Sequence, residues 1–210
     1  MRGVFLSFEG IEGTGKSTQA RLLAEYLTAR GYTVVQTAEP GGTPISMKIR
    51  DLLLSLESRG MDHMTELLLY NAARVQHIRE VIAPALARGE FVVTDRFSDS
   101  TLAYQGYGRG LDRKTIEAID AVATGCMKPD LTLLLDVDVE TGLRRNRGAN
   151  KRDRLELEHI AFHHRVRKGF HEIAAAEPER VRVVPCTDGI AAVHDAVRNL
   201  VERFLKGRVA

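Results

Sequence analysis

The residues of this chain that could bind phosphate lie in one stretch near its beginning, FEGIEGTGKSTQ at 8–19. Residues 10–17 fit the pattern G-x-x-x-x-G-K-[ST], with an apolar run before them and a helical pattern after them. Glycines allow the backbone to wrap until several N–H groups point inward, and such groups bind the phosphates of a nucleoside triphosphate. The residues predicted to form this loop and to bind ATP are Gly10, Ile11, Glu12, Gly13, Thr14, Gly15, Lys16, Ser17 and Thr18.

Two side chains of the loop have the chemistry that phosphoryl transfer needs. Lys16 is predicted to reach the β- and γ-phosphates, and the Ser17 hydroxyl is predicted to ligate Mg²⁺. A Gly-rich turn that matches the pattern by chance is the alternative. The strand pattern before the loop and the helix pattern after it make that alternative the weaker one.

A second pair of charged residues, Asp95 and Arg96, follows the predicted strand 91–94. Ligands of open parallel sheets bind beyond the carboxyl ends of the strands, so this pair is predicted to lie near the nucleotide. Asp95 would then hold Mg²⁺ through water, and Arg96 would bridge the donor phosphate and an acceptor phosphate. A structural ion pair is the alternative for Arg96.

The segment 144–154 is strongly basic, since six of its eleven residues are Lys or Arg and one is acidic. Charge runs of this kind are often only solvated faces. In a protein that binds a nucleoside triphosphate, a mobile Arg-rich lid would neutralise the transferring phosphoryl group and exclude water. A non-catalytic protein that binds a nucleic-acid backbone is another alternative, but the run is not interleaved with aromatic residues. We therefore predict a lid at about 144–154 and no nucleic-acid partner.

One motif of switch GTPases occurs in the chain without its context. Residues 150–153 match N-K-x-D, the guanine-reading string, but they follow a basic segment and not an apolar strand. The chain also has no D-x-x-G, which a GTPase switch would need. The match is therefore interpreted as accidental.

The elements that must position these residues are indicated by hydrophobic periodicity. Strand-like runs and helical patterns alternate, which predicts right-handed βαβ crossovers and a parallel sheet. The predicted fold is α/β: a P-loop NTPase-type, five-stranded parallel sheet with helices on both faces, in a single domain over 1–210. The predicted strands are 4–8, 33–37, 91–94, 131–135 and 181–184, and the clearest helices are 65–86, 155–176 and 190–205.

Composition excludes several other classes of protein. Hydrophobic residues make up 44% of the 210 residues and charged residues 28%, as in an ordinary globular domain. The formal net charge is +2, so no overall field favours nucleic acid. The chain has no apolar run of membrane-spanning length, its N-terminus lacks a signal peptide pattern, and its two cysteines form no disulfide framework. These features predict a cytoplasmic protein with no membrane partner.

Beyond the phosphate loop, several segments resemble the bacterial thymidylate kinase family in their order and spacing, over essentially the full length of the chain. They are EPGGT at 39–43, YNAARVQH at 70–77, DRFSDSTLAYQGYGRG at 95–110 and RDRLELE at 152–158. The resemblance implies an enzyme that transfers the γ-phosphoryl group of ATP to dTMP with Mg²⁺, and that forms homodimers. A kinase for another nucleoside monophosphate is the alternative.

The resemblance also implies which residues meet the acceptor base. Tyr70 would stack on thymine, and Arg74, on the same helix face, would donate a hydrogen bond to the thymine O4. Cytosine has an amino donor at that position, so dCMP should be rejected. Gln105 would bond the base through its amide, with Thr101 one helical turn before it.

Further residues would contact the acceptor sugar and phosphate. Tyr104 resembles the tyrosine that packs against the sugar and disfavours a 2′-hydroxyl, and Glu12 resembles the acidic residue that meets the 3′-hydroxyl. Arg50 resembles the arginine that grips the acceptor phosphate. In the lid, Arg147 and Arg154 are favoured to reach the transferring phosphate.

Catalysis would then rest on positioning and charge neutralisation. No general base is needed, because the attacking phosphate oxygen is already ionised near pH 7. The predicted catalytic residues are Lys16, Asp95, Arg96, Arg147 and Arg154.

Two histidines, His159 and His163, are four positions apart and could share a metal-binding helix face. No cysteine or carboxylate cluster completes a ligand set, so we interpret both as ordinary histidines on a helix surface.

Overall fold

A computed structural model describes residues 3–148 and 153–209 of the chain. Within these residues a five-stranded parallel sheet has the order β2-β3-β1-β4-β5. The predicted α/β fold with a five-stranded parallel sheet is confirmed. The strands are β1 (Val4–Glu9), β2 (Val34–Ala38), β3 (Phe91–Asp95), β4 (Leu131–Asp136) and β5 (Val181–Pro185).

Helices connect the strands and cover the sheet. None of those in the described part of the chain is long and apolar enough to cross a membrane. They are α1 (Lys16–Ala29), α2 (Pro44–Leu54), α3 (His63–His77), α4 (Ala83–Ala87), α5 (Ser98–Thr101), α6 (Arg113–Thr124), α7 (Val139–Gly148), α8 (Ile160–Ala176) and α9 (Gly189–Val209). A 3₁₀ turn η1 (Leu56–Ser58) and two π-helical segments, η2 (Ile78–Ile82) and η3 (Leu102–Gly108), complete the set.

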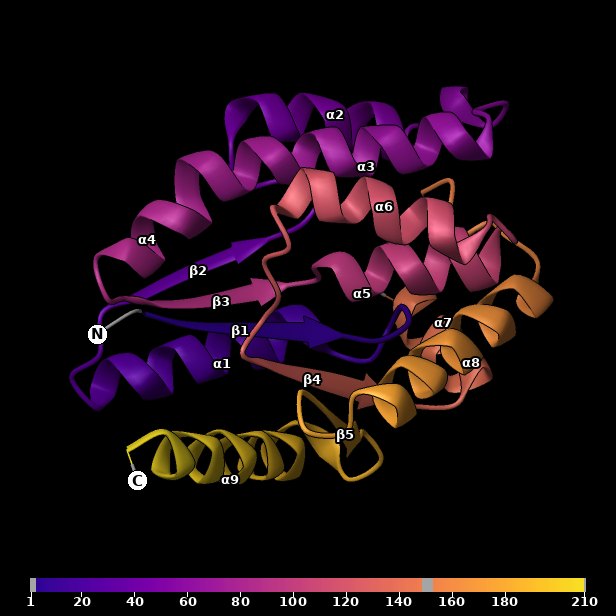
Figure 1. Ribbon diagram of the computed structural model, residues 1–210. Helices are drawn as coiled ribbons and strands as arrows, with labels where there is room; N and C mark the ends of the chain where they lie inside the picture. Colours follow the sequence, from indigo (N-terminus) through magenta and orange to yellow (C-terminus); the bar gives the residue numbers. More distant parts are fainter. Residues whose placement is uncertain (1–2, 149–152, 210) are drawn as a thin grey trace.

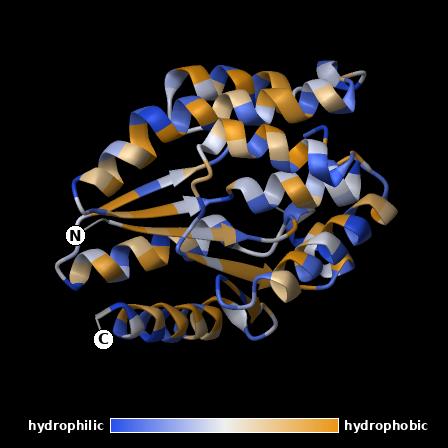
Figure 2. Cartoon of the chain, in the orientation of Figure 1, coloured by the Kyte–Doolittle hydropathy of each residue, from blue (hydrophilic) through white to orange (hydrophobic). Residues whose placement is uncertain are grey.

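The core lies on both faces of the sheet, because successive side chains of a strand point to opposite sides. Leu6 and Phe8 of β1 belong to a cluster that includes Leu23 of α1, whereas Phe5 packs in a second cluster with Ile82 of η2. In Figure 1, α2, α3 and α4 lie above the strands, α5 continues from the right-hand end of β3, and α1 and α9 lie at the lower left. The strands between these layers are largely hydrophobic (Figure 2).

The carboxyl ends of the central strands meet at one edge of the sheet, which is where ligands of such folds bind. β1 pairs with β3 on one side and with β4 on the other, so the crossovers diverge at β1. The register places Phe8 opposite Asp95, the last residue of β3. The loop after β1 and the pair Asp95–Arg96 therefore lie side by side, as the sequence predicts.

The structure differs from the predicted helix 155–176 at its beginning. Asp153 Oδ1 accepts hydrogen bonds from the backbone N–H groups of Leu155, at 2.9 Å, and Glu156, at 3.0 Å. These bonds close a turn, so α8 begins only at Ile160. Of the predicted lid, residues 144–148 form the end of α7, and 149–152 lie outside the described residues.

Candidate active site

The carboxyl ends of the strands open onto a cavity of about 670 Å³. Its size is that of a small-molecule site. The phosphate loop and the residues predicted for the acceptor nucleotide border this single space. The predicted site residues that line it are Glu12, Gly13, Gly15, Lys16, Ser17, Thr18, Arg50, Tyr70, Arg74, Asp95, Arg96, Thr101, Tyr104 and Gln105.

The backbone of the phosphate loop requires glycine at several positions. Gly10, Gly13 and Gly15 have φ angles of 137°, 72° and 90°, which L side chains rarely adopt. Gly13 also meets α7 directly, since a Cβ there would lie 1.9 Å from the carbonyl oxygen of Gly142. The helix that leads to the predicted lid thus packs against the loop.

Lys16 is buried at the start of α1 and folds back over the loop. Its Nζ donates to the carbonyl oxygen of Ile11 at 2.7 Å, and the Thr14 hydroxyl donates to the same oxygen at 3.0 Å. Burial and the nearby charge of Arg96 lower the pKa of Lys16 to about 8. Neighbouring carboxylates oppose this shift. The ammonium group is held by the loop that would surround the phosphates.

Ser17 and Asp95 form an oxygen-rich corner of the cavity. The Ser17 hydroxyl donates to Asp95 Oδ2 at 2.5 Å. The other oxygen, Asp95 Oδ1, is buried and has no hydrogen-bond partner among residues 3–148 and 153–209. Mg²⁺ prefers oxygen ligands, often one or two carboxylates with phosphates and water. These two side chains therefore fit the predicted magnesium site.

Arg96 lies between the phosphate loop and η3 with an unusual backbone, a φ of 74°. Its Nη1 donates to the carbonyl oxygen of Gly10 at 3.0 Å and to the Ser100 hydroxyl at 2.9 Å. Its Nη2 donates to the Tyr104 hydroxyl at 3.0 Å and to Glu12 Oε1 at 3.2 Å. A residue with a strained backbone that contacts two elements of a site is typical of a functional position.

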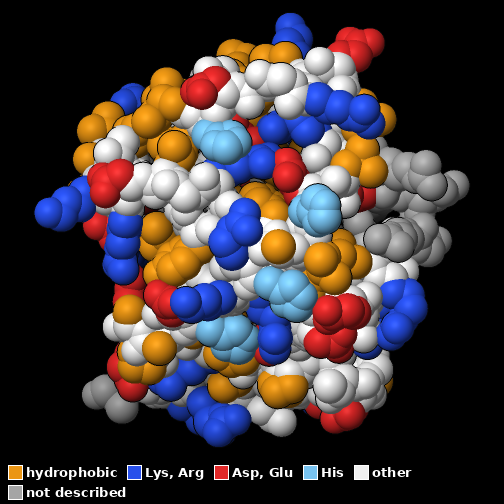
Figure 3. Space-filling model, turned by 90° about the vertical axis from the view of Figure 1, so that its right-hand side faces the viewer, with side chains coloured by type: hydrophobic (Ala, Val, Ile, Leu, Met, Phe, Trp, Pro, Cys, Tyr) orange, Lys and Arg blue, Asp and Glu red, His pale blue; other side chains and the backbone are white. Residues whose placement is uncertain are grey.

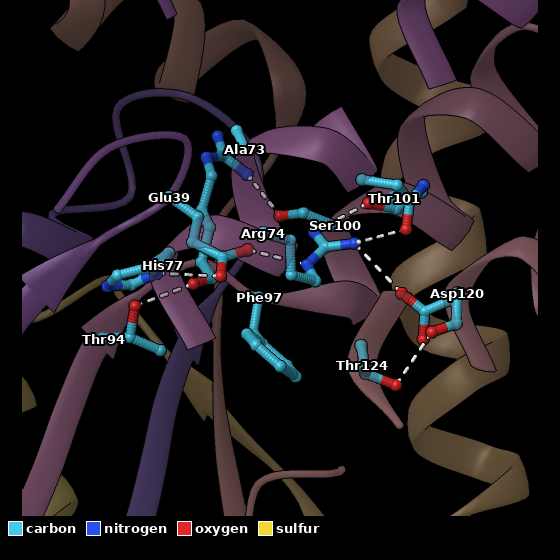
Figure 4. A network of polar contacts seen from close by, with 12 residues as sticks. Glu39, Ala73, Arg74, His77, Thr94, Phe97, Ser100, Thr101, Asp120 and Thr124 are labelled. Carbon is cyan, nitrogen blue, oxygen red and sulfur yellow. Dashed lines mark hydrogen bonds and ion pairs between the residues drawn. The ribbon is translucent and has the colours of Figure 1, made fainter. Parts of the chain in front are cut away.

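Arg74 lies in a buried network of charged and polar side chains from four parts of the chain (Figure 4). Its guanidinium donates to Glu39 at 2.8 Å, Asp120 at 3.0 Å and Thr101 at 2.9 Å. His77 Nδ1 lies 3.0 Å from the second oxygen of Glu39. The Arg74 side chain is only 2% exposed, so these partners fix its orientation.

A neighbouring buried cluster surrounds Glu66 and holds Gln105. Gln105 Nε2 donates to Glu66 at 2.8 Å, and Arg109 pairs with the same carboxylate at 3.1 Å. Arg154 also belongs here, because its Nη1 lies 2.6 Å from Glu66 and its Nε donates to the carbonyl oxygen of Leu53. In this conformation Arg154 is a buried partner of Glu66. It is not the free lid arginine that the sequence led us to expect.

The other predicted residues are placed as follows. Arg50 of α2 lines the cavity and donates to the carbonyl oxygen of Pro40 at 2.8 Å. Tyr70 of α3 also lines it and is half-buried. Arg147 lies in α7, but its side chain is outside the described residues.

Comparison with known proteins gives the family. The thymidylate kinase family model matches residues 8–197. This chain belongs to the thymidylate kinase family. It is 49% identical to the thymidylate kinase of Geotalea uraniireducens (strain Rf4), over 93% of this chain and 94% of that protein. It is 46% identical to the thymidylate kinase of Nostoc sp. (strain PCC 7120 / SAG 25.82 / UTEX 2576), over 98% and 99%.

A solved structure agrees with this membership. The chain superposes on a crystal structure of thymidylate kinase from Ehrlichia chaffeensis with a TM-score of 0.79 and 38% identity. The match covers 96% of this chain and 99% of the other. The family predicted from the sequence is confirmed.

Within this thymidylate kinase fold, sequence reasoning missed some residues at the site. Arg145 of α7 lines the cavity and donates twice to the carbonyl oxygen of Cys186, at 3.2 Å each. Glu39 and Asp120 hold Arg74. Glu39 stands at the end of β2 before a Pro/Gly loop, which is a usable signal. Asp120 lies in the middle of a helix, and its position in the sequence gives no such signal.

The prediction of surface histidines is right for His159 and wrong for His163. On the side of the molecule that lies to the right in Figure 1, histidines reach the surface among arginines and carboxylates (Figure 3). His159 and His164 are exposed. His163 is fully buried, and its Nδ1 lies 3.4 Å from Glu12 Oε2 in the phosphate loop. Spacing could not reveal this, because the partner comes from a loop 151 positions earlier in the chain.

Proposed function

We propose that this chain transfers the γ-phosphoryl group of ATP to the phosphate of dTMP, giving ADP and dTDP. Membership of the thymidylate kinase family supports this reaction and does not favour a kinase for another nucleoside monophosphate. The observation that carries the proposal is the shared cavity, which joins the phosphate loop to the cluster around Arg74. Direct transfer requires donor and acceptor phosphates to be neighbours.

On the donor side, the loop amides and Lys16 bind the β- and γ-phosphates. Lys16 now donates to the Ile11 carbonyl oxygen, and a triphosphate would replace that weaker acceptor. Ser17 and Asp95 would hold Mg²⁺, which supplies positive charge beside the phosphates. The unpartnered Asp95 Oδ1 supports this assignment.

On the acceptor side, Arg74 keeps one N–H that can donate to the base. Its Nε and Nη1 are engaged by Glu39, Asp120 and, at 3.5 Å, Asn71. Its Nη2 donates to Thr101, which leaves a second Nη2 hydrogen without a bond to any described residue. We assign this hydrogen to the thymine O4.

Thymine would stack on Tyr70 and meet the Gln105 amide, whose Nε2 is held by Glu66. Tyr104 and Glu12 would contact the sugar, because both line the cavity; the Tyr104 hydroxyl donates to Glu12 Oε1 at 2.5 Å. Arg50 and Arg96 would bind the acceptor phosphate. That phosphate is already ionised, so no base is required and its oxygen attacks the γ-phosphorus directly.

The basic segment 144–154 would close the site over both nucleotides. Arg147 is the favoured residue for the transferring phosphate, because Arg154 is occupied by Glu66. Exclusion of water prevents hydrolysis of ATP.

We also propose a cytoplasmic homodimer. Apolar side chains are exposed on α2 and α3, which pack against each other, and a second copy would cover them: Ile45, Leu52 and Leu68. Both cysteines are unpaired, as in a reducing compartment. Analytical ultracentrifugation should give twice the chain mass of 23.3 kDa. A single species of chain mass at micromolar concentration would contradict the dimer.

An acceptor panel tests the reaction. ATP, Mg²⁺ and each of dTMP, dUMP, dCMP, dGMP and UMP are assayed for ADP release and diphosphate product. The highest kcat/KM is expected for dTMP, with dCMP lower by at least about a hundredfold, because an amino donor would face Arg74. Equal use of dCMP, or ADP release without a diphosphate product, would contradict the proposal.

A further inference from the structure

The two oxygens of Glu12 have different surroundings. Oε1 accepts hydrogen bonds from the Tyr104 hydroxyl, at 2.5 Å, and from Arg96, at 3.2 Å. Oε2 is buried and has no hydrogen-bond partner among residues 3–148 and 153–209. The ring of His163 faces this oxygen, with Nδ1 3.4 Å away.

His163 is a costly residue for its position unless its ring has a polar function. The side chain is fully buried on α8, edge-on to Phe162 with ring centroids 5.4 Å apart. Neither ring nitrogen has an aligned hydrogen bond to a described residue. An apolar ring would fill the same space without burying two polar atoms. The ring nitrogen and the carboxylate oxygen that face each other are therefore best explained as a pair.

The competing partner of Glu12 is Arg96. Carboxylate and guanidinium groups prefer two parallel hydrogen bonds, and Arg96 now makes only one to Glu12. Without a partner at Oε2, the carboxylate could rotate toward Arg96. It would then leave the Tyr104 hydroxyl and occupy an arginine assigned to the acceptor phosphate.

The charge of Glu12 is consistent with this arrangement. Burial would raise the pKa of Glu12, but the contact with His163 and the charges of Arg96 and Lys16 hold it well below its usual range. Glu12 is thus an anion that can accept hydrogen bonds at both oxygens.

We propose that His163 is a positioning residue for the acceptor sugar: it holds Glu12 Oε2, so that Oε1 stays beside Tyr104 and can accept from the 3′-hydroxyl of dTMP. This rests on the proposed function, which assigns Glu12 to that hydroxyl. His163 itself does not touch the substrate. It connects α8, the helix that follows the basic segment, to the phosphate loop.

The test compares two substitutions that differ in one donor. His163→Phe keeps the ring volume and removes Nδ1, whereas His163→Asn places an amide N–H near the same position. His163→Phe should raise the KM for dTMP about tenfold and change kcat less than about threefold, because a positioned hydrogen bond is lost. His163→Asn should have a KM for dTMP close to the wild-type value. His164→Phe is the control, since His164 on the same helix is 51% exposed and, within the described part of the chain, forms an ion pair with exposed Glu140 alone.

A substrate change separates positioning from general damage. With 3′-deoxythymidine monophosphate there is no 3′-hydroxyl, so wild type and His163→Phe should differ less than about twofold in KM. In a protein that already carries Glu12→Gln, His163→Phe should raise the KM for dTMP little further. Thermal unfolding of each variant establishes that it is folded. Equal loss with both acceptors, or an undiminished effect in Glu12→Gln, would overturn the proposal.

Failure of the reaction itself would look different. Wild-type protein that does not phosphorylate dTMP would refute the proposed function. The pair would still be tested in the free protein, where ¹⁵N NMR of labelled histidine should show the His163 ring shifting on Glu12→Gln and the His164 ring not shifting. An unchanged His163 signal would overturn the pairing.

Discussion

The two halves of the cavity are built differently. On the donor side, Lys16 contacts Ile11 and Thr14 of its own loop, within five positions of itself. On the acceptor side, Arg74 is held by Glu39 after β2, Thr101 in α5 and Asp120 in α6. A donor group supported by local contacts can be removed without opening the core. An acceptor group buried among partners from three other elements serves both recognition and stability.

Lys16→Ala should show the largest loss of activity and little loss of stability. Removing the positive charge at the transferring phosphates should lower kcat on the order of a thousandfold. The free energy of unfolding should change by less than about 1 kcal/mol, because Lys16 serves the ligand and not the core. Steady-state kinetics and urea unfolding measure the two effects.

The exposed Lys114→Ala on α6 is the matched control and should match wild type in both measurements. A folded Lys16→Ala enzyme with more than about a tenth of wild-type kcat would contradict the donor-side assignment.

Arg74→Ala should affect both properties. Loss of the hydrogen bond to thymine O4 should lower kcat/KM for dTMP by about 2–4 kcal/mol and reduce discrimination against dCMP. Glu39 and Asp120 would lose their buried cation, so the free energy of unfolding should fall by about 3 kcal/mol. Arg74→Lys should recover part of the stability without the selectivity. Unchanged stability would show that the network does not support the core.

Arg154→Ala should act on stability more than on turnover. Its guanidinium pairs with Glu66, which keeps Gln105 and Arg109 as partners, so we expect a loss of about 1–3 kcal/mol of unfolding free energy. kcat should fall less than about threefold if this conformation persists in the closed enzyme. A hundredfold or larger fall in kcat at unchanged stability would instead show that Arg154 contacts the transferring phosphate.

Glu9 should give a slope of stability with pH rather than a loss of activity. Burial, then the charge of Asp99, raises the pKa of Glu9 from 4.5 to about 8. Between these values the folded state binds the proton and the unfolded state does not, so the unfolding free energy falls as pH rises through this window. One proton gives at most about 1.4 kcal/mol per pH unit.

Glu9→Gln should remove this slope, because the amide can bond to the Phe97 N–H and the Ser100 hydroxyl without a charge. The exposed Glu25→Gln should keep the wild-type slope. Urea unfolding at pH 5, 6.5 and 8 distinguishes the variants. Parallel curves for wild type and Glu9→Gln would contradict the buried, protonated carboxyl.

Sequence reasoning was strongest where function and local structure coincide. The strands follow from periodicity, and the phosphate loop follows from closely spaced glycines. Helices α2 and α6 were not predicted from the sequence, although both have N-cap residues that the sequence shows. Thr43, which precedes Pro44, accepts a hydrogen bond from the Ser46 N–H, and Asp112 accepts one from the Thr115 N–H.

The contacts that sequence could not give are long-range pairs of charged residues. Nothing local to Arg154 indicates that Glu66 lies beside it, and nothing local to His163 indicates Glu12. Both residues stand in stretches rich in exposed charge, where a solvated position is the ordinary expectation. Only the packing of α8 and its preceding turn against the rest of the chain decides otherwise.

The most direct measurement is a crystal structure with a bisubstrate analogue, thymidine and adenosine joined through a polyphosphate chain. The account predicts that the phosphates lie in the loop amides against Lys16 and that thymine stacks on Tyr70. The thymine O4 should accept a hydrogen bond from Arg74 Nη2, with Glu39 and Asp120 still in place. A base bound away from Arg74, or a phosphate chain outside the loop, would contradict the division of the cavity into these two halves.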